Sequence, residues 1–379
     1  MFQLRFIAMA ALAAVLSAPG FAATKYAVGS CQPKLRSYAT ISAAVSNVPS
    51  GSTILVCAGN YPEQVLITQP LTLEGVVGGS EAAVVVPPGG LVQSVNNDVN
   101  VGPVYYQILV ETTGPVNITN LAVDGTGGNS PVAGGIVAGL FYEDSSGTVE
   151  YVSARNQTNT GIGILVLTNG YPNTITVENS VVRGFDDRGI WVLSNEAGGL
   201  AANIKDNTIE GWPAGGASNM VGFVSAGANC IFQSNMINNV YLGLLLADSD
   251  VTTTSNTISA LYAIELTNDS STITGNTIVQ RGGSPAIYIE GGTTNLQGNR
   301  IDAGGQEGLI LGGGGSAIVE LNTIMNSSIA VDGCAESASG FTVTGNTITD
   351  AAIGVQMPSG NTTTLNKFYA TAMAVEACP

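Results

Sequence analysis

The chain has 379 residues, of which 10% are charged, 45% are hydrophobic and 49 are glycine, and it contains no histidine. Its formal net charge of −16 excludes an extended nucleic-acid interface, because phosphate binding needs clustered lysines and arginines. The same negative field repels polyuronate chains unless cations intervene. Among polysaccharides, a neutral chain, or an anionic chain bridged by calcium, therefore suits this negative charge better than a free polyuronate does.

Residues 1–22 have the features of a secretory signal peptide. Arg5 supplies the positive charge, Phe6 to Ser17 form an apolar run, and small residues continue to Ala22. The run is shorter than the roughly 20 residues that a membrane-spanning helix needs. We therefore expect a secreted or periplasmic protein with no membrane span.

Five cysteines in an exported chain favour disulfides. Cys31 and Cys57 each end a short strand-like run, so pairing of neighbouring strands predicts a bridge between them. Cys334 and Cys378 occupy matching positions, but one coil separates them. Two strand spacings of about 4.8 Å exceed the ~7 Å limit between Cα atoms unless the loops bend, so their pairing stays open. Cys230 is expected to be a buried small hydrophobic residue.

From the middle of the chain onward, an asparagine recurs at intervals of 20 to 28 residues, with an apolar residue two positions later and usually another three positions earlier. These asparagines are Asn179, Asn207, Asn235, Asn256, Asn276, Asn299, Asn322, Asn346 and Asn366. Each unit also holds a second alternating strand, such as Ala286 to Ile289. Such a period predicts coils that bury a core by stacking on their neighbours. The asparagine suits a sharp left-handed bend and can hydrogen-bond to the same asparagine in adjacent coils.

On these repeats the chain resembles the pectate-lyase-like superfamily of right-handed β-helices, including NosD-type repeat proteins. The segment from Tyr38 to Glu63 is similar to the N-terminal segment of pectin methylesterases, where a short amphipathic helix caps the first coil. Here Ile41, Ala44, Val45 and Val48 have helical spacing. The resemblance implies an all-β, single-stranded parallel β-helix with a short N-terminal capping helix. Residues 23–69 would form the cap and first coil, and residues 70–379 the β-helix with a C-terminal cap.

The resemblance implies a polysaccharide lyase or glycoside hydrolase if the protein is an enzyme. Histidine-dependent mechanisms are unavailable in their usual form, because the chain has no histidine. The internal aspartate motifs of pectin methylesterases have no counterpart here, and arginine, the base of pectate lyases, is scarce. No complete family active site transfers to this sequence, so whether the protein is an enzyme stays open.

One local cluster has catalytic potential. Arg183, Asp186, Asp187 and Arg188 place two carboxylates and two guanidinium groups in the turn before a strand. Paired carboxylates can act as acid and base or hold a cation. Ordinary turn chemistry also produces adjacent aspartates that flanking arginines neutralise.

Side-chain alternation predicts an outward column on one strand face. Its members are Leu165, Trp191, Leu245, Glu265, Tyr288 and Ile310, with an ambiguous coil near Val221 and Phe223. In the families that this chain resembles, the substrate groove lies over this face. We therefore predict that Trp191, Glu265 and Tyr288 contact a sugar chain. Alternatively, a loop at residues 78–102 or 125–134 covers the column as a second small core.

Acidic residues follow these strands at Asp248, Asp250, Asp269 and Glu290, and again at Asp332. Stacked carboxylates repel one another, and a bound Ca²⁺ would relieve that repulsion. Solvated turn residues are the other interpretation. Calcium is the one cofactor that the sequence suggests.

Two functions therefore compete. In the first, a secreted protein recognises a polysaccharide or cell-surface glycan along the predicted column, and cleavage of that chain stays open. In the second, a non-catalytic β-helix serves as a surface, adhesive or scaffold protein. The sequence leaves the oligomeric state open.

Overall fold

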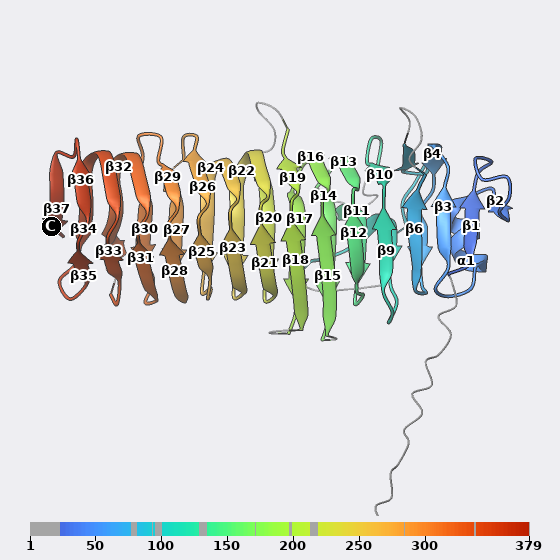
Figure 1. Ribbon diagram of the computed structural model, residues 1–379, viewed down its shortest axis with the longest axis horizontal. Coiled ribbons are helices and arrows are strands. Elements are labelled where there is room, and N and C mark those ends of the chain that lie inside the picture. Colours follow the sequence, from blue (N-terminus) through green and yellow to red (C-terminus); the bar gives the residue numbers. More distant parts are fainter. Residues whose placement is uncertain are drawn as a thin grey trace, which may run out of the picture.

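The structure is a computed structural model that describes residues 23–76, 82–92, 94, 101–128, 135–170, 172–196, 199–212, 219–283, 285–336 and 339–378. The predicted signal peptide and parts of the two predicted covering loops lie outside these residues. The described residues form an elongated solenoid of parallel strands that stack along one axis (Figure 1). This confirms the predicted parallel β-helix. No helix in this part of the chain is long and apolar enough to cross a membrane.

Each coil contributes strands to three faces. The first face is a 15-stranded sheet, in spatial order β2 (Ser37–Tyr38), β1 (Lys25–Val28), β3 (Thr53–Val56), β6 (Leu71–Gly75), β9 (Val116–Thr119), β12 (Gly147–Glu150), β15 (Asn173–Glu178), β18 (Leu200–Lys205), β21 (Asn229–Gln233), β23 (Asp250–Thr254), β25 (Thr272–Thr274), β28 (Thr293–Gln297), β31 (Ser316–Glu320), β33 (Thr342–Thr344) and β35 (Thr362–Thr364).

The second and third faces together make a 22-stranded sheet. The second face holds β4 (Gly59–Pro62), β7 (Ala83–Val86), β10 (Leu121–Asp124), β13 (Ser153–Gln157), β16 (Val181–Phe185), β19 (Thr208–Glu210), β26 (Thr277–Gln280), β29 (Arg300–Asp302) and β36 (Lys367–Tyr369). The third face holds β5 (Val65–Ile67), β8 (Val104–Val110), β11 (Ile136–Glu143), β14 (Gly161–Thr168), β17 (Arg188–Ser194), β20 (Val221–Ala226), β27 (Ile287–Glu290), β30 (Leu309–Gly312) and β37 (Met373–Ala377). Four long strands belong to both faces: β22 (Met236–Ala247), β24 (Thr257–Thr267), β32 (Thr323–Glu336) and β34 (Thr347–Met357).

Side-chain alternation builds the core. In one coil, Val177, Val182 and Ile190 point inward from the three faces and are fully buried. The next coil places Ile204, Ile209 and Phe223 directly against them in the parallel register. Because each inward residue packs on the equivalent residue of the next coil, the stacked coils share one continuous core. Fully burying one such side chain stabilises the fold by about 1.5–3 kcal/mol. A single coil has no second surface against which to bury these residues.

Buried asparagines join the coils at the turn between the first and second faces. Asn256 is typical: its backbone N–H and its side-chain amide both donate to Oδ1 of Asn276, each at 2.9 Å, and the amide also donates to the carbonyl of Phe232. The same pattern links Asn207, Asn235, Asn256, Asn276, Asn299, Asn322, Asn346 and Asn366.

Two details of the predicted turn are wrong. The left-handed residue is the one before each asparagine, for example Ser255 at φ 57° and Gly275 at φ 65°, because the asparagine must point its amide inward along the stack. At the start of the series, Asn179 is itself the exposed left-handed residue, and the backbone N–H of Ser180 donates to Asn207. The ladder position is therefore occupied by Ser180.

The N-terminal end is closed by the helix α1 (Ile41–Asn47). Its buried residues are Ile41, Ala44 and Val45, and Val48 is buried just after it, which confirms the predicted spacing. The Glu63 carboxylate accepts hydrogen bonds from the backbone N–H groups of Ile41, at 2.9 Å, and of Ser42, at 2.8 Å. A carboxylate here satisfies donors that have no partner within the helix.

The cysteines form two bridges. Cys31 and Cys57 are disulfide-bonded, as predicted, with their Cα atoms 5.7 Å apart. Cys334 and Cys378 are also bonded, with Cα atoms 5.4 Å apart. The intervening strand β34 ends at Met357, one residue before the level of the two cysteines, so no strand separates them there. Cys230 is free and buried, and burial raises the pKa of its thiol to about 12.

Candidate functional site

The third face carries an outward column whose register is continuous over the coils. In order, its members are Leu109, Phe141, Leu165, Trp191, Val224, Leu245, Glu265, Tyr288, Ile310, Asp332 and Gln356. This register confirms the predicted sequence of Leu165, Trp191, Leu245, Glu265, Tyr288 and Ile310. In the coil that was ambiguous, Val224 occupies the column and Phe223 points into the core.

The N-terminal half of the column is covered. Leu165, Trp191 and Val224 belong to a second apolar cluster outside the coils, which also contains Val101 from the end of the first predicted covering segment. Trp191 is 8% exposed, and the guanidinium of Arg188 lies 4.0 Å from the centre of its ring. In this half of the column the side chains form a small core, and Trp191 presents little surface to a ligand.

The next four members are half-buried, and the first of them, Leu245, still packs against the edge of the outer apolar cluster. Leu245, Glu265, Tyr288 and Ile310 follow one another on β22, β24, β27 and β30, and we call these four residues the open strip. Strands in a sheet lie about 4.8 Å apart, so the strip is ~14 Å long. It ends at Asp332, which is buried and whose carboxylate accepts hydrogen bonds from the backbone N–H groups of Cys334 and Ala335.

Two tyrosines that the sequence analysis did not identify flank the open strip. The rings of Tyr241 and Tyr262 are 5.0 Å apart, and both residues pack at the edge of the outer apolar cluster. They lie where β22 and β24 bend from the second face to the third. The available signal was a tyrosine three or four residues before an outward residue in two successive coils, Tyr241 before Leu245 and Tyr262 before Glu265.

Glu265 is the carboxylate of the open strip. Its pKa is raised, first by burial and then by repulsion from Glu290 in the next coil. Glu290 is exposed and lies two residues beyond Tyr288. The strip thus combines apolar and aromatic surface with one carboxylate that is easier to protonate than usual.

The residues of the predicted catalytic cluster bind different partners and do not form one site. Asp186 accepts hydrogen bonds from the indole N–H of Trp212, at 2.8 Å, and from the backbone N–H of Asn159, at 2.7 Å. Asp187 forms an ion pair with Arg188, and burial raises its pKa although Arg188 opposes the shift. The two carboxylates therefore have different partners.

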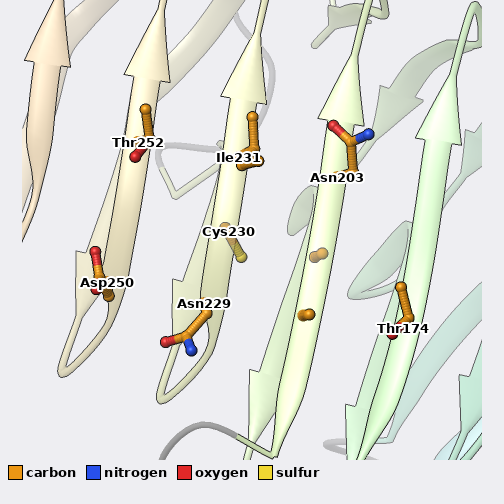
Figure 2. Close-up of a pocket in the computed structure, with 9 residues that line it drawn as sticks. Thr174, Asn203, Asn229, Cys230, Ile231, Asp250 and Thr252 are labelled. Atoms are coloured by element: carbon orange, nitrogen blue, oxygen red, sulfur yellow. The ribbon is translucent and has the colours of Figure 1, made fainter.

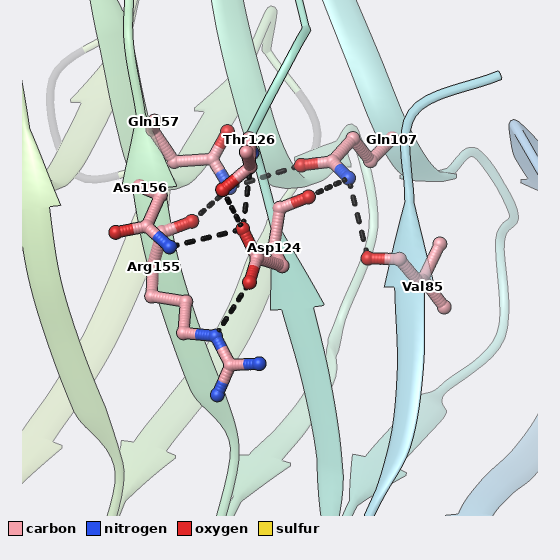
Figure 3. Close-up of polar contacts among 7 residues, drawn as sticks. All are labelled: Val85, Gln107, Asp124, Thr126, Arg155, Asn156 and Gln157. Atoms are coloured by element: carbon pink, nitrogen blue, oxygen red, sulfur yellow. Dashed lines mark hydrogen bonds and ion pairs between the residues drawn. The ribbon is translucent and has the colours of Figure 1, made fainter. Parts of the chain in front are cut away.

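Arg183, the fourth member of the predicted cluster, is exposed on the second face between Arg155 and Glu210. Figure 3 shows the polar network next to it. Burial disfavours the charged form of Asp124, but hydrogen bonds from Thr126, Arg155 and Asn156 outweigh this effect and lower its pKa to about 2. Arg155 is thereby neutralised, which reduces its repulsion of Arg183.

Among the described residues, no group of three or more acidic, cysteine or histidine side chains is placed to hold a metal ion, and the predicted calcium ligands lie in different surroundings. Asp248 is exposed in the turn before β23, Asp250 is exposed at the first position of β23, and Glu290 is exposed at the last position of β27. Asp269 is fully buried and accepts hydrogen bonds from the hydroxyl of Ser271 and the backbone N–H of Ser249.

Comparison with known proteins supports the architecture. Residues 219–369 match the family model described as the right-handed β-helix region. No curated protein matches the chain.

Three solved structures are similar to this chain, and the two with TM-scores above 0.5 illustrate the likeness in fold. The A-module of mannuronan C-5 epimerase AlgE6 from Azotobacter vinelandii is 15% identical, with a TM-score of 0.60 over 88% of this chain and 94% of that one. The GH136 lacto-N-biosidase from Eubacterium ramulus is 12% identical, with a TM-score of 0.54 over 91% and 68%. PfbA, a surface adhesin of Streptococcus pneumoniae, is 12% identical, with a TM-score of 0.48 over 89% and 86%. At these identities the likeness concerns the fold alone, and the predicted right-handed parallel β-helix is confirmed.

Proposed function

We propose that this protein is exported and binds a neutral glycan along the open strip. The observation that carries the proposal is the change in the outward column, which is a closed apolar core up to Val224 and a half-exposed surface from Leu245 to Ile310. Aromatic and aliphatic side chains can pack against the C–H faces of sugar rings, and Glu265 can accept hydrogen bonds from hydroxyl groups. Two disulfides and the predicted signal peptide support export.

The charge distribution favours a neutral chain. Glu265 and Glu290 lie on or beside the strip, and the whole protein carries a net charge of −16. A polyuronate would be repelled by both, and the described residues hold no cluster of acids to bridge it through calcium. The epimerase and the lacto-N-biosidase with the same fold are named for carbohydrate substrates, which supports a glycan as the ligand class.

The test is calorimetric titration with cellohexaose, xylohexaose, mannohexaose and maltohexaose. We expect at least one hexasaccharide to bind, and Tyr288→Ala to weaken that binding at least tenfold because the strip loses its central ring. Tyr369→Ala is the matched control, since Tyr369 is an exposed tyrosine on the second face. Equal losses in both variants, or no loss in Tyr288→Ala, would refute the assignment.

Cleavage of the same glycan is a second candidate function, and one observation favours it. The raised pKa of Glu265 suits a general acid, and glycoside hydrolysis needs such an acid beside a second carboxylate, here Glu290. Mass spectrometry of the incubated hexasaccharides decides between the two functions. Shortened products that disappear in Glu265→Gln, with binding retained, would establish cleavage; unchanged sugars would establish binding alone.

A further inference from the structure

The first face has a hollow of its own, away from the open strip. It has a volume of about 330 Å³ and lies over β15, β18, β21 and β23 (Figure 2). Two outward columns border it. One runs through Thr174, Ala201, Asn229 and Asp250, and the other through Asn203, Ile231 and Thr252.

Ala201 is the reason for the hollow. The neighbours of Ala201 in its column are Thr174 and Asn229, whose side chains are both longer. A single methyl group between them leaves the outer surface recessed by the length of the missing atoms. The recess therefore follows from one residue in a regular sheet, and a larger side chain at that position would fill it.

The polar groups around the hollow are available to a ligand. Within the described part of the chain, the side chains of Asn203, Asn229 and Asp250 make no hydrogen bond or ion pair, whereas the buried asparagines of the coil turns are each bonded to the next. Figure 2 shows these three side chains on successive strands. Beside them, Ile231 is 48% exposed and offers an aliphatic surface.

These lining residues select a class of ligand. None of them is Lys, Arg or aromatic, so neither an anion nor a planar ring has a partner. Asp250 is the one acidic residue among them, too few for a calcium ion that takes six to eight oxygen ligands. The amides of Asn203 and Asn229 both donate and accept, as sugar hydroxyl groups do, while Ile231 and Ala201 can pack against C–H groups.

We propose that this hollow is a second saccharide site, which takes a short stretch of a neutral sugar chain. It lies on the first face and the open strip lies on the third, so neither site contributes residues to the other. The site does not depend on the open strip binding sugar. Where both bind, one protein molecule can hold two glycan segments, and the second contact benefits from the high effective concentration that the first creates.

The experiment uses the full mature protein and the same four hexasaccharides, with calorimetric stoichiometry as the readout. Ala201→Phe fills the hollow and is expected to weaken binding at this site at least tenfold, leaving one site per molecule. Thr272→Phe is the control, because it adds the same ring to an exposed position of the same face, one strand beyond the hollow, in the neighbouring column that runs through Ile231 and Thr252. Asn229→Ala adds no bulk and should weaken the same site. It keeps the proposal testable if Ala201→Phe fails to fold.

Tyr288→Ala separates the two proposals, since it damages the strip and leaves the hollow intact. Sugar binding that survives in Tyr288→Ala and is lost on adding Ala201→Phe would establish the hollow as a site. If no hexasaccharide binds to Tyr288→Ala, or if Ala201→Phe and Thr272→Phe bind alike, the hollow is not a saccharide site. Neither of those results affects the open strip, whose own test is the loss caused by Tyr288→Ala in the otherwise unchanged chain.

Discussion

Replacing Asp269 by asparagine should stabilise the protein in a way that depends on pH. The Asp269 side chain is fully buried, and its pKa is raised from 3.8 to about 6. Burial is the largest cause, opposed by the hydrogen bonds from Ser271 and Ser249 and reinforced by the charges of Asp250 and Asp248. A difference of about two pKa units between the unfolded and folded chains corresponds to roughly 3 kcal/mol.

The sign follows from proton binding. Between pH 4 and pH 6 the folded protein holds a proton on Asp269 that the unfolded chain releases, so this contribution to stability falls as the pH rises. Above pH 6 the folded protein contains a buried charge. Asp269→Asn keeps the shape of the side chain and removes that charge. It should therefore raise the free energy of unfolding at pH 8 by up to about 3 kcal/mol and change it little at pH 4.

The assay is urea unfolding of both proteins at pH 4 and pH 8, followed by circular dichroism. Asp350→Asn serves as the control, because Asp350 is an exposed residue of β34 and asparagine tolerates its positive φ of 53°. A stabilisation by Asp269→Asn that is the same at both pH values would refute the argument, since it would have to come from packing or hydrogen bonding. Destabilisation at pH 8 would show that the hydrogen bonds from Ser249 and Ser271 need the ionised carboxylate.

Three further substitutions test the fold and the site. Asn256→Ala leaves two buried backbone groups of the preceding coil, the N–H of Asn235 and the carbonyl of Phe232, without partners and should cost about 2–4 kcal/mol in urea unfolding, whereas Asn117→Ala, at an exposed position of β9, should change little. Trp191→Ala should cost about 3–5 kcal/mol and leave hexasaccharide binding unchanged, because the ring is packed in the outer apolar cluster; loss of binding without loss of stability would restore Trp191 as a sugar contact. Glu63→Gln should cost about 1–2 kcal/mol and loosen α1, as hydrogen exchange at Ile41 and Ser42 would show; protection equal to that of the unchanged protein would contradict a role in capping.

The sequence predicts the fold because its signals repeat. Every coil must bury apolar residues against the next, so a residue such as Ile278 recurs at the same place relative to its asparagine in coil after coil. Alternation then determines which side chains point outward, and the column from Glu265 to Ile310 has the predicted register. The one coil that alternation left ambiguous, at Val224, also follows a segment outside the described residues.

What covers the column was not predictable in detail. Trp191 and Tyr288 occupy equivalent positions and both looked like sugar contacts, yet Trp191 is buried and Tyr288 is half-exposed. Alternation distinguishes inside from outside within a coil, and it carries no information on packing between the outer surface and segments distant in sequence. The same limit applies to the Cys334–Cys378 bridge, which depends on where β34 ends.

The outward side chains of the third face and of the first face differ in size and polarity. On the third face, large apolar residues such as Leu165 and Phe141 project outward and need cover, so this face is closed wherever a segment packs on it and open where none does. On the first face, most outward residues are polar and need no cover, and the short side chain of Ala201 leaves a recess among them. Because the strands of successive coils keep the same register, outward residues can change without disturbing the core.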